Sequence, residues 1–144
     1  MPDFGPNGGD GGHPFDEVAP PGFEIAGLFI RGDPKRFLVS IQALYRHQQT
    51  GDLTLGDRHG GPGETIPIAL RGGEYFTEIS GRTGQFVDSL ALETNQGGRF
   101  GRFGGLGGST DYENPPTHTG LEIFGFFGRS GTLIDAIGIH TRQR

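Results

Sequence analysis

One pattern occurs three times along this chain, at nearly even spacing. Residues 30–45 read IRGDPKRFLVSIQALY, residues 79–94 read ISGRTGQFVDSLALET, and residues 126–141 read FFGRSGTLIDAIGIHT. Each segment opens as a glycine loop and runs on into a strand-like stretch. A unit of this size cannot bury its apolar face alone, so the repeat predicts three similar units packed around one core. We expect internal pseudo-threefold symmetry.

A second kind of glycine-rich segment alternates with the first. It occurs as GPNGGDGGHPFDE (5–17), GDRHGGPGETIPI (56–68) and GRFGGLGGSTDYE (101–113). We expect these three segments to be loops as well. The two kinds of loop together divide the chain into three strand-rich thirds.

Composition favours an all-β fold. The chain has 144 residues, of which 29 are glycine and 32% are apolar. Each interior glycine would cost a helix about 1 kcal/mol relative to alanine, so helices are disfavoured. A chain of this length is sufficient for one domain, which we place over residues 1–144.

Short apolar or alternating stretches mark the expected strands. Pro67 lacks the N–H group that a sheet ladder needs, so its strand is expected at an edge or a bulge. Stretches bounded by Gly, Pro and Asp predict strands at residues 23–30, 36–46, 64–70, 74–80, 86–94, 121–127 and 133–141.

Charge and residue content argue against several classes of function. The formal net charge of −5 disfavours nucleic acid, whose binding depends on clustered lysine and arginine. There is no cysteine, and the five histidines show no ligand spacing, so we expect no metal site and no cofactor. No stretch approaches the ~20 apolar residues of a membrane span, and the N-terminus lacks signal-peptide features. We expect a soluble, cytoplasmic protein without membrane insertion, and release by a non-classical route stays open.

The most specific chemistry lies in two of the repeated loops. Gly84 and Gly131 each stand four residues before an aspartate, Asp88 and Asp135 respectively. A glycine that is free to adopt positive φ lets the chain turn sharply, so that the following N–H groups point outward together. The aspartate carboxylate only accepts hydrogen bonds. Donors and a strong acceptor in one small loop suit vicinal sugar hydroxyls, and a facing Gly-Gly segment would leave room for the sugar.

Two terminal segments together resemble a known family. The chain has a Gly-Gly loop, then strands, then a GxxxD loop, with GPNGGDGGHPFDE near the start and GRSGTLIDAIGIH near the end. This order is similar to that of the jacalin-related lectins, over nearly the whole chain. The resemblance implies a β-prism I fold, with three four-stranded Greek-key sheets around a pseudo-threefold axis. It also implies carbohydrate binding without catalysis, and assembly as a homodimer or higher homo-oligomer.

The resemblance places a primary site where the first glycine loop meets the last GxxxD loop. Gly12, Thr132 and Leu133 would offer backbone N–H groups there. Asp135, which closes the loop that Gly131 opens, would accept from two sugar hydroxyls. In this family galactose preference accompanies a proteolytically freed N-terminal glycine near the site. Here the chain runs on upstream as MPDF, so glycans that contain mannose or glucose are the expected partners.

The internal repeat predicts a second site. Gly84, Gln85, Phe86 and Asp88 match the GxxxD loop of the first site, and Gly108 matches its glycine loop. This assignment depends on the repeat alone.

The remaining third departs from the pattern at both loops. It reads GDPKR, with Arg36 in the place expected for the aspartate, and GGPGE, with Glu64 replacing the second glycine. Pro34 also removes a backbone donor. We therefore expect two sites per chain and not three.

Two other classes of function stay open. A glycoside hydrolase would need two carboxylates about 5–9.5 Å apart. Only Asp16 and Glu17 lie near the first loop as partner acids, and Asp16 is instead expected to fix the turn. A scaffold that binds no ligand is the second alternative, since one third has lost the pattern.

Overall fold

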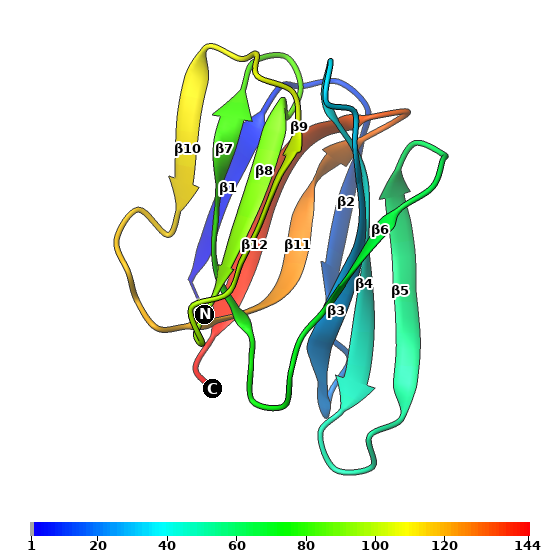
Figure 1. The fold of residues 1–144 in the computed structure, drawn as a ribbon, viewed down its shortest axis with the longest axis vertical. Coiled ribbons are helices and arrows are strands. Elements are labelled where there is room, and N and C mark those ends of the chain that lie inside the picture. The colour runs from blue at the N-terminus through cyan, green and yellow to red at the C-terminus, as the bar shows by residue number, and fades with distance from the viewer. Residues whose placement is uncertain (1) are drawn as a thin grey trace.

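The computed structural model describes residues 2–144 as an all-β molecule (Figure 1). No helix occurs in this range, and therefore none that is long and apolar enough to cross a membrane. The predicted all-β class is confirmed. The twelve strands are β1 (Asp3–Gly8), β2 (His13–Val18), β3 (Phe23–Gly32), β4 (Leu38–His47), β5 (Leu53–Gly60), β6 (Ile66–Ala69), β7 (Phe76–Thr83), β8 (Ser89–Thr94), β9 (Arg99–Gly104), β10 (Thr110–Asn114), β11 (Glu122–Ser130) and β12 (Ile134–Arg142).

The strands form three antiparallel sheets of one design. Their strand orders are β1-β12-β11-β2, β5-β4-β3-β6 and β10-β7-β8-β9. In each sheet a hairpin with a loop of the first kind supplies the two inner strands. A glycine-rich loop joins the two edge strands, which lie on opposite sides of the sheet and do not pair with each other. The sheets surround a common apolar core, so the predicted threefold arrangement of four-stranded sheets is confirmed (Figure 1).

The first sheet is assembled from both ends of the chain. Strands β1 and β2 come from the N-terminus, whereas β11 and β12 come from the C-terminus. Ile139 on β12 lies opposite Phe4 on one side and Phe126 on the other. This pairing carries the first glycine loop to the last GxxxD loop, although the two are far apart in the sequence.

The sequence pattern misses five strands, which are β1, β2, β5, β9 and β10. All five are edge strands, and most of their side chains are exposed or only partly buried. Because they contribute little to the core, they lack the apolar alternation that marks a strand. The segments predicted as loops therefore consist largely of edge strands, with loops only at residues 9–12, 61–65 and 105–109. The strand that contains Pro67, β6, is an edge strand as predicted.

Three equivalent residues join the inner hairpins near the axis. Leu38, Val87 and Ile134 each follow a loop of the first kind and are fully buried. The N–H of Leu38 donates to the carbonyl of Val87, and the N–H of Val87 donates to the carbonyl of Ile134, both at 2.9 Å. These bonds hold the three hairpins together at the end of the molecule that carries the loops, the upper end in Figure 1.

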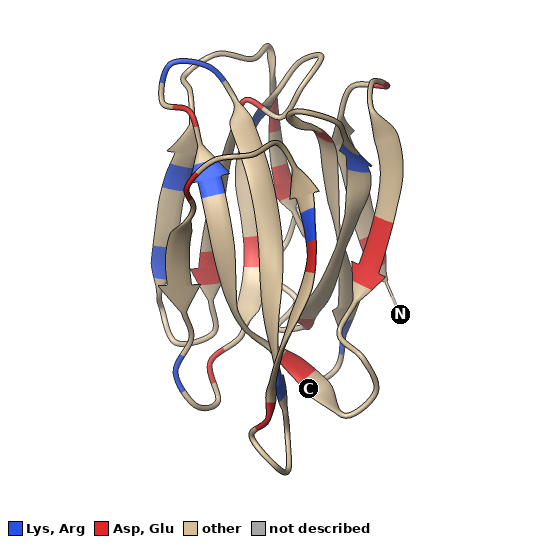
Figure 2. Cartoon of the chain, turned by 90° about the vertical axis from the view of Figure 1, so that its right-hand side faces the viewer, with Lys and Arg blue, Asp and Glu red and all other residues tan. Residues whose placement is uncertain are grey.

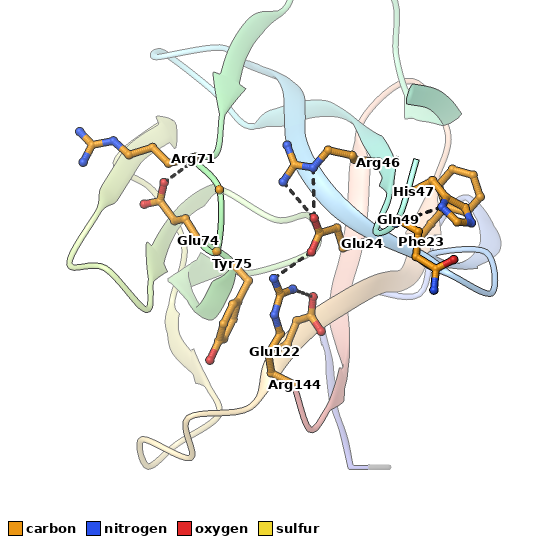
Figure 3. A network of polar contacts seen from close by, with 12 residues as sticks. Phe23, Glu24, Arg46, His47, Gln49, Arg71, Glu74, Tyr75, Glu122 and Arg144 are labelled. Atoms are coloured by element: carbon orange, nitrogen blue, oxygen red, sulfur yellow. Dashed lines mark hydrogen bonds and ion pairs between the residues drawn. The ribbon is translucent and has the colours of Figure 1, made fainter. Parts of the chain in front are cut away.

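Buried charges lie at the opposite end, where the C-terminus returns (Figures 1 and 3). Glu24 and Glu122 are 7% and 1% exposed. Arg144 bridges them, with guanidinium nitrogens 2.8 Å from Oε1 of Glu24 and 2.8 Å from Oε2 of Glu122. Arg46 pairs with Glu24 at 3.0 Å, and Arg142 pairs with Glu122 at 2.8 Å. Arg142 and Arg144 thus connect the C-terminal end of the chain to Glu24 on β3 and Glu122 on β11.

The remaining charges are dispersed. Figure 2 shows basic and acidic residues interspersed over the side of the molecule that carries β5 and β6. Exposed pairs such as Arg99 with Glu93 lie on the sheet of β7 to β10, at 2.9 Å. Neither sign of charge dominates the side seen in Figure 2.

Replacing Glu122 with Gln should weaken the fold. The change leaves Arg142 and Arg144 without their shared countercharge, and breaking a buried pair costs about 3–5 kcal/mol. Because both arginines keep some solvent contact, we expect a loss of about 2–4 kcal/mol in the free energy of unfolding, measured with urea. The control Arg99→Gln breaks an exposed pair and should cost less than about 1 kcal/mol. Equal losses in the two variants would contradict a structural role for the buried network.

Candidate functional site

Six loops gather at one end of the molecule (Figure 1). Three of them close the inner hairpins, and the other three join edge strands. At the first corner, the glycine loop lies directly against the side chain of Asp135. A Cβ added to Gly11 would lie 2.6 Å from Oδ2 of Asp135, and one added to Gly12 would lie 2.6 Å from Oδ1. The structure therefore brings Gly12 and Asp135 together, and only residues without a side chain fit between the loop and the carboxylate.

The donors of this corner come from a tight turn. The N–H of Gly131 donates to the carbonyl of Leu133 at 3.0 Å, which folds the loop back on itself. Among the described residues, no hydrogen bond engages the N–H groups of Gly12, Thr132 or Leu133. Three unused donors thus lie on the two loops that flank one carboxylate.

Burial sets the electrostatics of the carboxylate. Asp135 is only 5% exposed, and burial raises its pKa above the ordinary value of 3.8. The charge of Arg129 and the backbone N–H groups of Asp135 and Gly131 lower the pKa, but they do not cancel the effect of burial. An acceptor with few protein donors of its own is available to the donors of a ligand.

An arginine holds each glycine loop in place. Arg129 donates from Nε to the carbonyl of Gly11 and from Nη2 to that of Gly12, both at 3.0 Å. Arg82 donates from Nη2 to the carbonyl of Gly108 at 2.7 Å. Neither arginine was among the predicted site residues. The shared GRSG and GRTG segments were the available signal, because the third repeat has Asp33 at that position.

The second corner repeats the geometry of the first. A Cβ added to Gly108 would lie 3.0 Å from Oδ1 of Asp88, which is 6% exposed. The N–H of Gly84 donates to the carbonyl of Phe86 at 3.0 Å, as in the first turn. Among the described residues, the N–H groups of Gln85, Phe86 and Gly108 have no hydrogen-bond partner. Burial also raises the pKa of Asp88, against a lowering by Arg82.

The prediction that Arg36 replaces the aspartate in the third corner is wrong. The backbone shows that Val39 is the counterpart of the two aspartates, because the three residues accept equivalent hydrogen bonds. The carbonyls of Asp135, Val39 and Asp88 accept from the N–H groups of Gly9, Gly61 and Gly105, at 2.9, 3.0 and 2.9 Å. Arg36 corresponds instead to Gln85 and Thr132. The sequence alignment slipped by three residues because Lys35 stands where the other repeats have their second glycine.

The third corner nevertheless lacks the parts of a site. Val39 offers no carboxylate, and Glu64 stands where the other two corners have Gly12 and Gly108, as predicted. The N–H of Arg36 is already bonded to the carbonyl of Asp33 at 3.0 Å. The corner therefore lacks the carboxylate acceptor, and one of its backbone donors is already engaged.

The two complete corners adjoin each other. A hollow of about 420 Å³ lies between the first glycine loop and the second GxxxD loop. A Cβ added to Gly9 would lie 2.1 Å from the carbonyl oxygen of Gln85, so the two loops are in backbone contact. The hollow is lined by Gly9, Asp10, Gly11, Gly84, Gln85, Phe86 and Asp135.

Comparison with known proteins agrees with this geometry. The family model of the jacalin-like lectin domain matches residues 4–140. The chain belongs to the jacalin-like lectin family. Horcolin of Hordeum vulgare is 33% identical over 143 residues, which cover 95% of this chain and 94% of horcolin.

The names of two further similar proteins include a sugar. The mannose/glucose-specific lectin of Parkia pendula is 30% identical over 147 residues, covering 96% of this chain and 31% of that protein. The artocarpin–mannotriose crystal structure superposes with a TM-score of 0.81 and 32% identity, covering 97% of this chain and 96% of that one. This jacalin-like lectin spans only about a fifth to a third of the length of its larger relatives.

The candidate acids for hydrolysis are engaged elsewhere in this jacalin-like lectin. Glu17 bonds to Tyr45 and, at 2.9 Å, to His59. Burial alone would raise the pKa of Glu17, but these hydrogen bonds lower it overall. Asp16 does not fix a turn as predicted, because it lies in β2 and contacts His140 at 2.6 Å. Neither residue lines the hollow beside Asp135.

Replacing Asp135 with Asn should leave the fold intact or stabilise it. A folded-state pKa raised by burial means that the ionised carboxylate opposes folding above its unfolded pKa, and protonation as the pH falls relieves this effect. Asn removes the charge at nearly constant shape. We expect an equal or higher Tm at pH 7, and the difference from wild type should shrink toward pH 3. A Tm clearly below wild type at pH 7 would contradict the argument.

Replacing Arg129 with Leu should loosen the first glycine loop. The change removes two charge-assisted hydrogen bonds to backbone carbonyls, each worth about 1.5–3 kcal/mol at most and less where exposed. We expect faster amide exchange at residues 9–12, measured by NMR, with residues 105–109 unchanged. Arg99→Leu serves as the matched control, because its guanidinium contacts no loop carbonyl. Unchanged exchange at residues 9–12 would show that the arginine does not hold the loop.

Proposed function

We propose that this chain binds mannose- or glucose-containing glycans at two sites and does not catalyse a reaction. One observation carries the proposal. At each of two corners, a carboxylate with few protein donors lies beside glycines and unused backbone N–H groups. The first site comprises Gly12, Gly131, Thr132, Leu133 and Asp135. The second comprises Gly84, Gln85, Phe86, Asp88 and Gly108.

The chemistry of this arrangement suits a pyranose. A sugar hydroxyl both donates and accepts, so two neighbouring hydroxyls can donate to the two oxygens of one carboxylate while accepting from backbone N–H groups. The glycines leave a space beside the carboxylate that any Cβ would fill. Because the donors belong to short hydrogen-bonded turns, little ordering is needed when a sugar binds.

The names of the relatives support the choice of sugar. The Parkia pendula relative is named for mannose and glucose, and the artocarpin structure contains mannotriose. Two corners of this chain supply the backbone N–H donors and the carboxylate acceptor that such a sugar would need. Mannose or glucose is therefore the sugar class that we assign.

Affinity for a single sugar should be weak. Each hydrogen bond adds only about 1 kcal/mol net, so a few such bonds correspond to a millimolar Kd. Two adjacent sites, and assembly into a homodimer, would raise avidity for branched glycans by about 10²- to 10⁴-fold. The oligomeric state and a cytoplasmic location stay predictions.

The same geometry supports the proposal that the chain catalyses no reaction. Asp88 and Asp135 belong to different corners, and each carboxylate is packed against its own glycine loop. A hydrolase would need a second acid across the bond to be cleaved. The nearest candidates, Asp16 and Glu17, are engaged by His140 and by Tyr45 and His59.

Calorimetric titration tests the proposal. We expect methyl α-mannoside to bind with a stoichiometry near two per chain, falling toward one in Asp135→Asn and toward one in Asp88→Asn. The double variant should release no heat, and circular dichroism should show that it remains folded. Methyl α-galactoside serves as the control ligand. Heat with galactoside and none with mannoside would overturn the choice of sugar, and no heat with either would overturn the proposed function.

A further inference from the structure

The two sites differ at one position of their glycine loops. Asp10 follows Gly9 in the first loop, and Leu106 follows Gly105 in the second. The two glycines donate equivalent hydrogen bonds to the carbonyls of Asp135 and Asp88, both at 2.9 Å. Asp10 and Leu106 are therefore structural counterparts, one charged and one apolar.

This position lies next to the carboxylate in both sites. In the second loop, Leu106 precedes Gly107, where an added Cβ would lie 3.0 Å from Oδ2 of Asp88. In the first loop, Asp10 precedes Gly11, where an added Cβ would lie 2.6 Å from Oδ2 of Asp135. Asp10 also lines the hollow beside that carboxylate. A sugar held by the carboxylate thus has this residue at its edge.

Leu106 has no protein surface to pack on. It is 83% exposed, more than any other large apolar side chain among the described residues. A single exposed leucine is ordinary on a protein surface. This one differs because glycines flank it on both sides, at residues 104–105 and 107–108, so that its apolar surface stays uncovered beside the site. The exposed Leu53 and Leu55 lie instead on the edge strand β5.

We propose that Leu106 makes the second site selective for sugars that carry an apolar substituent, such as an aryl or alkyl aglycone. The inference rests on the proposed function of that site. A substituent that covers Leu106 removes apolar surface from water, which favours binding. Asp10 is hydrated and only accepts hydrogen bonds, so the first site gains nothing from the same substituent and suits a hydroxylated neighbour. The two sites would then prefer different glycans: the second site those with an apolar substituent, and the first site those with a hydroxylated neighbour.

Two glycosides that differ only in the aglycone test this selectivity. Methyl and phenyl α-mannoside are titrated into Asp135→Asn, which keeps only the second site, and into Asp88→Asn, which keeps only the first. We expect phenyl α-mannoside to bind the second site about three- to tenfold more tightly than methyl α-mannoside. At the first site the two Kd values should agree within about twofold.

Exchange of the two side chains provides the matched controls. Leu106→Asp in the Asp135→Asn background should abolish the preference for the phenyl glycoside while methyl α-mannoside still binds. Asp10→Leu in the Asp88→Asn background should create that preference in the first site. Both residues are exposed, so neither change should alter the fold, which circular dichroism checks.

The failures are distinguishable. Equal binding of both glycosides at the second site, or a preference that survives Leu106→Asp, would overturn the role of Leu106 and leave sugar binding intact. Loss of all binding in Asp135→Asn would overturn the second site and with it this inference. No binding of either glycoside to the wild-type chain would overturn the proposed function itself.

Discussion

The arrangement of the loops depends on one contact between backbones. At each corner, the glycine loop meets the residue that ends the loop of the inner hairpin so closely that no side chain fits. A Cβ added to the glycine that ends the outer strand would lie 2.0–2.2 Å from that carbonyl oxygen, at Gly8 against Asp135, Gly60 against Val39 and Gly104 against Asp88. The next glycine along donates a hydrogen bond to the same oxygen. Edge and inner strands of each sheet therefore converge at one point.

This contact occurs at all three corners, including the one without a carboxylate. It is therefore a feature of the fold and is not specific to the proposed sugar sites. The proposed binding depends on what is added to it. Asp88 and Asp135 add a carboxylate, whereas an arginine donates to the glycine loop at all three corners. Val39 shows that the backbone contact persists without a carboxylate. The two carboxylates oppose folding slightly, since burial raises the pKa of both aspartates.

The two ends of the molecule differ in their polar groups. The end with the loops carries unused backbone donors beside two buried carboxylates, whereas the other end neutralises Glu24 and Glu122 with arginines from β4 and the C-terminus. Sheets fixed at both ends hold the loops without a ligand. The proposed sites, made from backbone groups on such a frame, would be preorganised, so that a few hydrogen bonds would suffice for weak binding.

The sequence by itself determined the threefold repeat and the all-β class. It also predicted the residues of the two proposed sites, the first through the family resemblance and the second through the repeated glycine and aspartate spacing. It did not reveal the edge strands, since β1, β2, β5, β9 and β10 bury too little to show alternation. The ungapped repeat already aligns Val39 with Asp88 and Asp135, but matching the glycines alone led to Arg36. Hydrogen bonds between distant backbones decided the register of the third corner in favour of Val39. The GRTG and GRSG segments mark Arg82 and Arg129 as equivalent, but only the tertiary structure placed them on the glycine loops, because contacts between residues far apart in the chain leave no mark in local spacing.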